Sequence, residues 1–317
     1  MTNALELQDV TKRYVGHLAV DRLSVVVPKG TIYGILGPNG AGKSTTLRMV
    51  MNIIARDSGA IALLGTDPAR DPAVLRRVGY LPEERGLYRK MTALDVVVFF
   101  GALRGMAESD ARRVGANWLE KMGLAQWQHA KIETLSKGMQ QKVQFVTTVV
   151  HGPELLILDE PTSGLDPVNQ EVLRETIIGA KSEGRTVVFS THNMDQAEQL
   201  CDSVCIIAKG RKVLDGALRD IRHGHAGRRY WLEFDEVTPG VLEFMNGGRF
   251  PGAGRTGNAW TFDLPTDADV QAALSALAAA RLDVVRFEHV KPSLHEIFVQ
   301  QVGHAEVAER RPEVTRA

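Results

Sequence analysis

The sequence has few of the residues that mark disulfide-rich, secreted or membrane-spanning proteins. Two cysteines in 317 residues are too few for a disulfide framework. No stretch reaches the roughly 18 uncharged apolar residues of a membrane helix, and the first ten residues lack the apolar core of a signal peptide. The 38 basic and 38 acidic side chains cancel, which argues against nucleic-acid binding through bulk positive charge. We expect a cytoplasmic protein without a membrane segment of its own.

The two cysteines, Cys201 and Cys205, lie four residues apart. That spacing is compatible with half of a metal site, but a zinc site needs two further ligands at matching spacing, and none is nearby. The alternative is a pair of buried free thiols, which suits a reducing compartment and which we favour.

Short apolar runs alternate with helical patterns through the first two thirds of the chain. Gly30–Gly37, Leu155–Leu158 and Thr186–Phe189 predict buried strands, and the apolar spacing in Lys43–Ile54 predicts a helix. Strands alternating with helices indicate an α/β fold with a parallel sheet covered on both faces. The hydrophobic content of 44% is ample for such a core.

Other segments interrupt this alternation. Ala4–Val10 and Val20–Val27 predict antiparallel strands, and Asp202–Asp215 predicts a hairpin around a Lys-Gly turn. Met91–Val150 predicts an inserted helical subdomain, with one apolar stripe formed by Val96, Phe99, Phe100 and Leu103. The sheet is therefore expected to be mixed and to carry an antiparallel β subdomain.

The composition changes near Arg219, where the polar segment Arg222–Arg229 predicts a linker. Beyond it we expect three strands and a helix, at Tyr230–Phe234, Trp260–Leu264, Leu282–Phe287 and Val270–Ala280. The expected organisation is an α/β domain over residues 1–218 (helical subdomain about 88–150), a small α+β accessory or regulatory domain over 219–304, and a flexible tail over 305–317.

The segment Gly37–Ser44 has the sequence G-P-N-G-A-G-K-S and lies between a predicted strand and a predicted helix. This spacing is typical of a phosphate-binding loop, in which glycines let successive N–H groups converge on one anion and the helix N-terminus adds its dipole. Lys43 is expected at the β- and γ-phosphates, and Ser44 at Mg²⁺. The residues expected to bind a nucleotide here are Gly37, Pro38, Asn39, Gly40, Ala41, Gly42, Lys43, Ser44 and Thr45.

Two carboxylates, Asp159 and Glu160, follow the strand Leu155–Leu158. Ligands bind at the carboxyl ends of parallel strands, so Asp159 is expected to hold Mg²⁺ and Glu160 to act as the general base on water. His192 follows the strand Thr186–Phe189, from which an imidazole can donate to the γ-phosphate. We therefore predict Lys43, Glu160 and His192 as the catalytic residues.

These motifs, in this order, resemble the ABC ATPases over roughly residues 4–217. Leu135–Met139 (L-S-K-G-M) resembles the family signature L-S-G-G-Q, Ser163–Asp166 resembles its D-loop, and His192 matches its switch histidine. Tyr14 falls where the family places an aromatic ring against adenine. The whole chain is similar to the ATP-binding subunits of sodium or multidrug exporters that carry an extra C-terminal domain.

The resemblance implies a head-to-tail dimer in which the signature and D-loop of one subunit cover the ATP of the other. The residues that would do so are Ser136, Lys137, Gly138, Met139 and Asp166. Lys137 and Met139 depart from the family pattern, and Lys137 either attracts phosphate or points to solvent. Glu83 stands where the family usually has a glutamine, so it is expected at ATP and Mg²⁺, although its charge repels the γ-phosphate.

The resemblance also implies a separate integral-membrane permease, docked on the segment that follows Glu83. Leu87 and Tyr88 are the favoured contacts, whereas Phe99 and Phe100 are expected in the core. The predicted function is ATP hydrolysis that powers transport, with export favoured, by a homodimer on the inner face of the membrane. The alternatives are a soluble ABC ATPase acting on nucleic acid or the ribosome, and a phosphotransferase, which leaves the signature unexplained.

Overall fold

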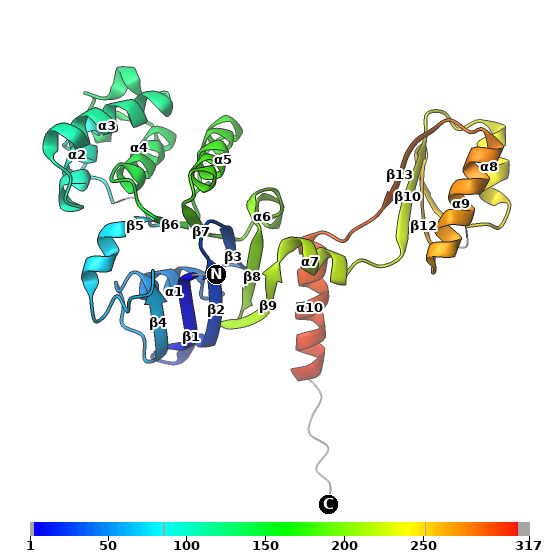
Figure 1. Cartoon of the computed structure of the whole chain (residues 1–317), viewed down its shortest axis with the longest axis horizontal. Helices are drawn as coiled ribbons and strands as arrows, with labels where there is room; N and C mark the ends of the chain where they lie inside the picture. Colours follow the sequence, from blue (N-terminus) through cyan, green and yellow to red (C-terminus); the bar gives the residue numbers. More distant parts are fainter. Residues whose placement is uncertain (1–2, 85, 251, 310–317) are drawn as a thin grey trace, which may run out of the picture. The chain divides into compact units, whose positions relative to one another are not determined.

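The chain folds into two units, Met1–Leu218 and Arg219–Ala317, each considered by itself (Figure 1). The structure is a computed structural model. It describes residues 3–84, 86–250 and 252–309, with only the backbone of 302–309. Within these described ranges, no helix has both the length and the hydropathy needed to cross a bilayer.

The main sheet of the first unit has six strands in the order β5-β6-β7-β3-β8-β9. Their bounds are β3 Ile32–Leu36, β5 Val78–Leu81, β6 Leu155–Asp159, β7 Thr186–Thr191, β8 Ser203–Ala208 and β9 Arg211–Ala217. All neighbours pair in parallel except β8 and β9, so the predicted mixed sheet and hairpin are confirmed. Every residue of β3, β6 and β7 is buried, because both faces are covered.

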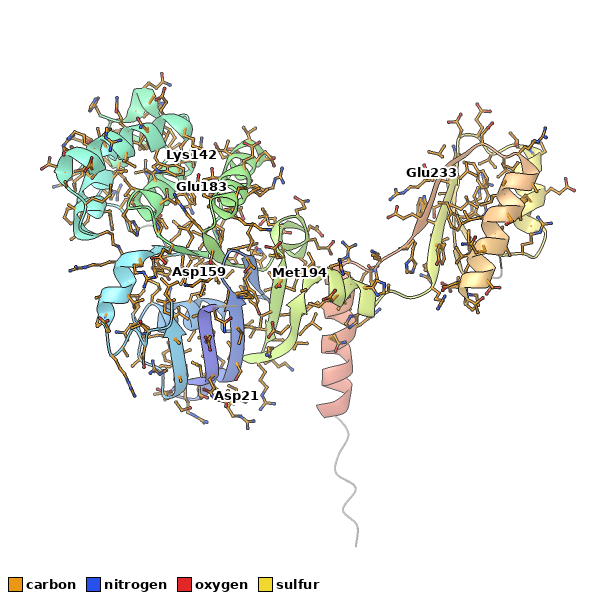
Figure 2. The ribbon with its side chains drawn as sticks, viewed as in Figure 1. Asp21, Lys142, Asp159, Glu183, Met194 and Glu233 are labelled. Carbon is orange, nitrogen blue, oxygen red and sulfur yellow. The ribbon has the colours of Figure 1, made fainter. Side chains whose placement is uncertain are left out.

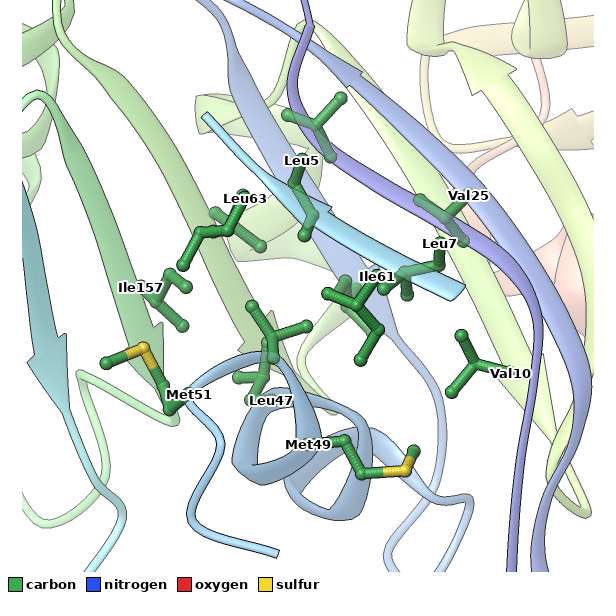
Figure 3. Close-up of a cluster of buried hydrophobic side chains, with 14 of the residues drawn as sticks. Leu5, Leu7, Val10, Val25, Leu47, Met49, Met51, Ile61, Leu63 and Ile157 are labelled. Atoms are coloured by element: carbon green, nitrogen blue, oxygen red, sulfur yellow. The ribbon is translucent and has the colours of Figure 1, made fainter. Parts of the chain in front are cut away.

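A second sheet in this unit has three antiparallel strands in the order β2-β1-β4. Their bounds are β1 Asn3–Tyr14, β2 His17–Pro28 and β4 Ser58–Leu63. The predicted strand pair is confirmed, with Leu5 opposite Val27 and Leu7 opposite Val25. Figure 3 shows Leu5, Leu7 and Val25 in one cluster with Leu47 and Ile157, the core shared with the main sheet.

Helix α1 Lys43–Val50 follows β3 and leads to β4 of the second sheet, whereas α5 Pro167–Ser182 and α6 Met194–Leu200 connect strands of the main sheet. Helices α2 Ala93–Leu103, α3 Glu108–Lys121 and α4 Lys137–Val149 pack against one another as a group (Figure 1). This group confirms the expected helical region.

Three local predictions in the first unit need correction. Helix α1 ends at Val50 instead of Ile54, because the chain turns at Asn52, whose φ is +54°. The predicted stripe is incomplete, since Leu103 is 61% exposed. Phe99 and Phe100 are half-buried, and both rings contact the exposed ring of Tyr88 instead of the core.

The second unit contains a four-stranded antiparallel sheet in the order β11-β12-β10-β13. Its elements are α7 Leu218–Gly224, β10 Arg229–Phe234, α8 Pro239–Asn246, β11 Gly254–Thr256, β12 Ala259–Asp263, α9 Asp267–Ala280, β13 Val284–His289 and α10 Leu294–Glu309. Side chains of α8 and α9 pack on one face of the sheet around Leu232, Phe234 and Phe262. The predicted α+β composition is confirmed.

The sequence patterns missed several elements of this unit. Arg222–Arg229 is not a continuous linker, because its first three residues complete α7. The helix α8 and the strand β11 were not predicted, since each is short and lies beside a turn. The expected tail begins too early, because residues 305–309 still belong to α10, and residues 310–317 lie outside the described residues.

Candidate functional site

The loop between β3 and α1 follows a path that only glycine allows. Gly37 and Gly42 have φ values of +151° and +105°. A Cβ atom at Gly37 would lie 2.1 Å from the carbonyl oxygen of Ile207, and one at Gly42 would lie 2.4 Å from that of Ala19. The loop therefore packs directly against neighbouring backbone, which leaves its amides directed at a common ligand.

The N-terminus of α1 lies at the end of this loop. Its N-cap is Gly42, and among the described residues no side chain caps it. The first N–H groups of the helix are thus left for a ligand, and the helix dipole favours an anion there. This loop borders a cavity of about 370 Å³.

The cavity brings together distant predicted residues. Tyr14 from β1, Glu83 after β5 and Glu160 after β6 line it with the loop. The complete lining comprises Tyr14, His17, Ala19, Asn39, Gly40, Ala41, Gly42, Lys43, Ser44, Thr45, Arg48, Glu83 and Glu160. Tyr14 is 45% exposed, with Lys12 Nζ 5.6 Å from its ring centroid, so part of the ring is accessible for stacking. One site therefore contains an aromatic ring, an anion-binding loop and two carboxylates.

Asp159 is fully buried at the end of β6 (Figure 2). Its Oδ1 accepts hydrogen bonds from the hydroxyls of Ser44, at 3.1 Å, and Ser190. Burial raises the pKa of this carboxyl above its ordinary value, while the two hydroxyls oppose that shift. Among the described residues, Oδ2 has no hydrogen-bond partner.

This orphan oxygen fits a hard cation. A buried carboxylate oxygen without a partner is costly, and a cation ligand or its bound water would satisfy it. Ser44 Oγ and Asp159 are already adjacent, and hydroxyl and carboxylate oxygens are the ligands that Mg²⁺ prefers. The donor set here is thus suited to Mg²⁺, with Glu83 on the lining of the same cavity.

Glu160 adopts a left-handed backbone, with φ of +47°. Such strain is rare outside glycine and persists when neighbours enforce it. Here the Glu160 N–H donates to both the carbonyl oxygen, at 3.2 Å, and the hydroxyl, at 3.1 Å, of Ser190. Because of this turn, the Asp159 carboxylate contacts Ser44, whereas the Glu160 carboxylate contacts His192.

The carboxylate of Glu160 is 8% exposed and lies close to an imidazole and an ammonium group. Its Oε1 lies 3.0 Å from Nδ1 of His192 and 3.4 Å from Nζ of Lys43. Lys43 Nζ also donates to the carbonyl oxygens of Gly37, at 2.8 Å, and Pro38, at 3.2 Å. The three residues predicted as catalytic thus share a single cluster.

The signature and D-loop residues lie outside the cavity lining. Ser136 is the N-cap of α4, and its Oγ accepts the N–H of Met139 at 3.2 Å. Asp166 is the N-cap of α5, where the hydrogen bonds from Asn169 lower its pKa. A Cβ at Gly138 would lie 3.8 Å from Asn169, so these two helix starts are neighbours in one chain. Lys137 is exposed.

Besides Ala19, which also lines the cavity, three residues of the site were not assigned from sequence. Ser190 donates its hydroxyl to Asp159 and accepts the N–H of Glu160. Its role could be recognised only from its position opposite Asp159 in the neighbouring strand, which the strand pairing reveals. His17 and Arg48 line the cavity, and neither belongs to a motif. Arg48 lies one turn after Ser44 on α1, a spacing that directs both toward one side.

Comparisons with known families agree with the geometry. Residues 20–163 match the family described as ABC transporter, and residues 216–302 match the C-terminal domain of DrrA1-3-like ATP-binding proteins.

Individual relatives match over almost the whole chain. The uncharacterized ABC transporter ATP-binding protein YhaQ of Bacillus subtilis is 36% identical over 94% of this chain and 98% of its own. Nod factor export ATP-binding protein I of Cupriavidus metallidurans is 32% identical over 96% and 98%. A solved ATP-binding subunit of an ABC transporter is 33% identical, with a TM-score of 0.65, over 70% of this chain and 92% of that one.

Proposed function

The chain belongs to the ABC transporter ATP-binding proteins, and from this premise we propose that two copies close on Mg²⁺ and ATP to drive an export permease. The family makes it an ATPase that hydrolyses ATP to drive transport. The observation that carries the assignment of catalytic residues is the cluster at Glu160, whose Oε1 lies 3.0 Å from His192 Nδ1 and 3.4 Å from Lys43 Nζ.

In the proposed mechanism the phosphate loop binds the triphosphate and Tyr14 stacks on adenine. Glu160 accepts a proton from the attacking water. His192 holds the Glu160 carboxylate and, with Lys43, stabilises the negative charge that develops on the γ-phosphate. The backbone strain at Glu160 keeps its carboxylate on the water side while Asp159 turns to Ser44.

The residues proposed to hold Mg²⁺ are Ser44, Asp159 and Glu83. When bound there, the cation would neutralise negative charge on the phosphates. The orphan Oδ2 of Asp159, as far as the described residues show, is the support for this assignment.

We assign the second ATP-binding surface to the starts of α4 and α5. Ser136 and Gly138, with Asp166 close by, are proposed to cover the nucleotide bound by the other copy. The N-terminus of α4 offers a second anion-binding end at which a γ-phosphate is stabilised. Loss of the γ-phosphate removes the bridging charge, so the dimer opens after hydrolysis.

The permease is proposed to dock beside the segment that follows Glu83. A groove of about 240 Å³ there is lined by Leu87, Phe100 and Arg104, among others, and the exposed ring of Tyr88 contacts Phe100. Docking there would hold the subunit at the inner face of the membrane. Export is favoured because a relative of nearly equal length is a Nod factor export protein.

Glu160→Gln tests the proposal. The amide keeps the shape of the side chain but accepts no proton, so we expect ATP binding to persist, turnover to fall by about 100-fold or more, and closed dimers to accumulate with ATP. Phosphate release and sedimentation with Mg²⁺-ATP measure both effects. The matched control is Glu171→Gln, an exposed carboxylate of α5 that pairs with Arg174. Turnover of Glu160→Gln equal to that of the control would contradict the assigned base.

A further inference from the structure

Gln144 joins two segments that the proposed function places on different ATP molecules. It lies in α4 and is 4% exposed. Its Nε2 donates to the carbonyl oxygens of Pro82, at 3.4 Å, and Glu84, at 3.1 Å. These two carbonyls flank Glu83. We infer that Gln144 is a positioning residue that couples Glu83 to the signature end of α4, an inference that rests on the proposed function.

The chemistry of the amide fixes its orientation. Carbonyl oxygens only accept hydrogen bonds, so the NH₂ group must face them. Oε1 is then turned away, and among the described residues it is buried without a partner. An orphan acceptor is a cost to stability. An apolar residue of the same length would avoid that cost, so the donation to the Glu83 segment is what the glutamine contributes.

The signature lies at the other end of the same rigid element. Ser136 caps α4, and eight residues at 1.5 Å each separate it from Gln144 by about 12 Å along the helix. Thr148, one turn further on, donates its hydroxyl to the carbonyl oxygen of Tyr80 at 3.4 Å. Helix α4 is therefore bonded to both the end of β5 and the residues around Glu83.

The bonds from Gln144 to the segment around Glu83 affect turnover. Glu83 lines the cavity of its own chain, whereas Ser136 and Gly138 are proposed to cover the partner's nucleotide. A displacement of Glu83 on nucleotide binding is passed through the two carbonyl bonds to α4. Gln144 thereby couples occupancy of one site to the position of the signature at the other, without itself lining the nucleotide cavity.

Two variants separate donation from packing. Gln144→Met keeps length and removes the donor. Gln144→Glu keeps shape and places acceptors against two carbonyls until a proton restores a donor. The matched control is Lys142→Met, which removes a donor on the same helix that bonds Met122 at 2.9 Å within the helical group (Figure 2). All are made in the full chain.

The kinetic test splits kcat from KM. We expect Gln144→Met, which removes both donations, to lower kcat about tenfold, with KM for ATP within about twofold. Lys142→Met should match wild type. A kcat for Gln144→Met within twofold of wild type, or an equal rise in KM, would overturn the inference.

The pH profile supplies a readout that packing would not move. Lowering the pH from 8 to 6 should raise the ratio of Gln144→Glu turnover to wild type by about threefold, because protonation restores one donor. The ratio for Gln144→Met should stay flat. The charged and titratable neighbours are Tyr80, Arg104, His151 and Glu84, and taking the ratio cancels their contribution. A flat ratio for Gln144→Glu counts against donation.

Hydrogen exchange without nucleotide keeps the two proposals distinguishable. Gln144→Met should raise exchange about threefold or more in peptides covering residues 78–90, and Lys142→Met should not. Absence of Mg²⁺-ATP hydrolysis by wild type would refute the proposed function alone. Unchanged exchange in Gln144→Met would refute the link, whatever the activity of wild type.

Discussion

At the scale of single residues, the site holds groups that are costly to the fold. Asp159 is buried with a raised pKa and an oxygen that no described group satisfies. Glu160 has a left-handed backbone. Such violations concentrate where function requires them, and substitutions that relieve them stabilise the protein at the expense of activity.

Asp159→Asn tests whether relieving this cost raises stability and lowers activity. Removing the buried charge should raise the melting temperature of the nucleotide-binding unit without Mg²⁺ by about 2–4 °C, equivalent to about 1 kcal/mol in a unit of this size. The same variant should lose the Mg²⁺-dependent part of its stabilisation by ATP. Calorimetry with and without Mg²⁺ measures both, and Asp110→Asn, an exposed carboxylate of α3 that pairs with Arg113, is the comparison. A lower melting temperature without metal would contradict the argument.

His151 predicts acid sensitivity. Burial, together with the charge of Arg104, lowers its pKa from 6.5 to about 4. Between pH 6.5 and 4 the unfolded chain therefore binds a proton at this histidine, whereas the folded chain does not. The free energy of unfolding is thus highest above pH 6.5 and decreases as the pH falls toward 4. We expect His151→Phe to show a smaller drop in melting temperature between pH 7 and 5 than wild type. Parallel curves would mean that His151 does not carry the effect.

At the scale of elements, helix starts place the working groups. Gly42 leaves the start of α1 without a side-chain cap among the described residues, whereas Ser136, Asp166 and Asn193 each cap their helix. The uncapped start borders the cavity. A cap satisfies one of the first N–H groups internally, so α1 keeps all of these donors for phosphate, whereas α4 keeps those other than the Met139 N–H that Ser136 accepts.

In the second unit, α9 begins with a full capping box. Thr266 Oγ1 accepts the N–H of Asp269 at 3.2 Å, and Asp269 accepts the N–H of Thr266 at 2.9 Å. Thr266→Ala should therefore destabilise this unit by about 1 kcal/mol, or about 4–8 °C. The control is Ser275→Ala, an exposed position inside α9 where alanine favours the helix. Equal melting temperatures for the two variants would exclude a role for the cap.

At the scale of the whole molecule, the two units have separate hydrophobic cores. One core joins the two sheets of the first unit around Leu47, and the other surrounds Phe262 in the second. The predicted ATP-binding residues all belong to the first unit. Each unit thus has the apolar packing needed to unfold as a separate cooperative block.

Calorimetry of the full chain should therefore show two transitions. Mg²⁺-ATP at 100 times its Kd stabilises whatever binds it by about 2.7 kcal/mol, so only the transition of Met1–Leu218 should move. Thr266→Ala should move only the other. In Lys43→Ala, the addition of ATP should change the temperature of neither transition. A shift of both transitions with ATP would show that the units unfold together.

The sequence alone determined the fold class and most of the chemistry. The spacing of Gly37–Ser44 and the acids after Leu155–Leu158 follow from local requirements, because a phosphate loop and a buried strand end each need particular residues at fixed intervals. The antiparallel pair at the start of the chain and the helix α9 were likewise fixed by alternation and periodicity.

Tertiary structure alone decided which distant residues meet. Ser190 contacts Asp159 because β6 and β7 are neighbours, and Gln144 reaches Glu84 because α4 packs near the end of β5. Neither pairing leaves a periodic trace in the sequence. The half-burial of Phe99, whose ring contacts Tyr88, was decided in the same way. Periodicity reports which side of an element is apolar, whereas strand order and packing determine what that side touches.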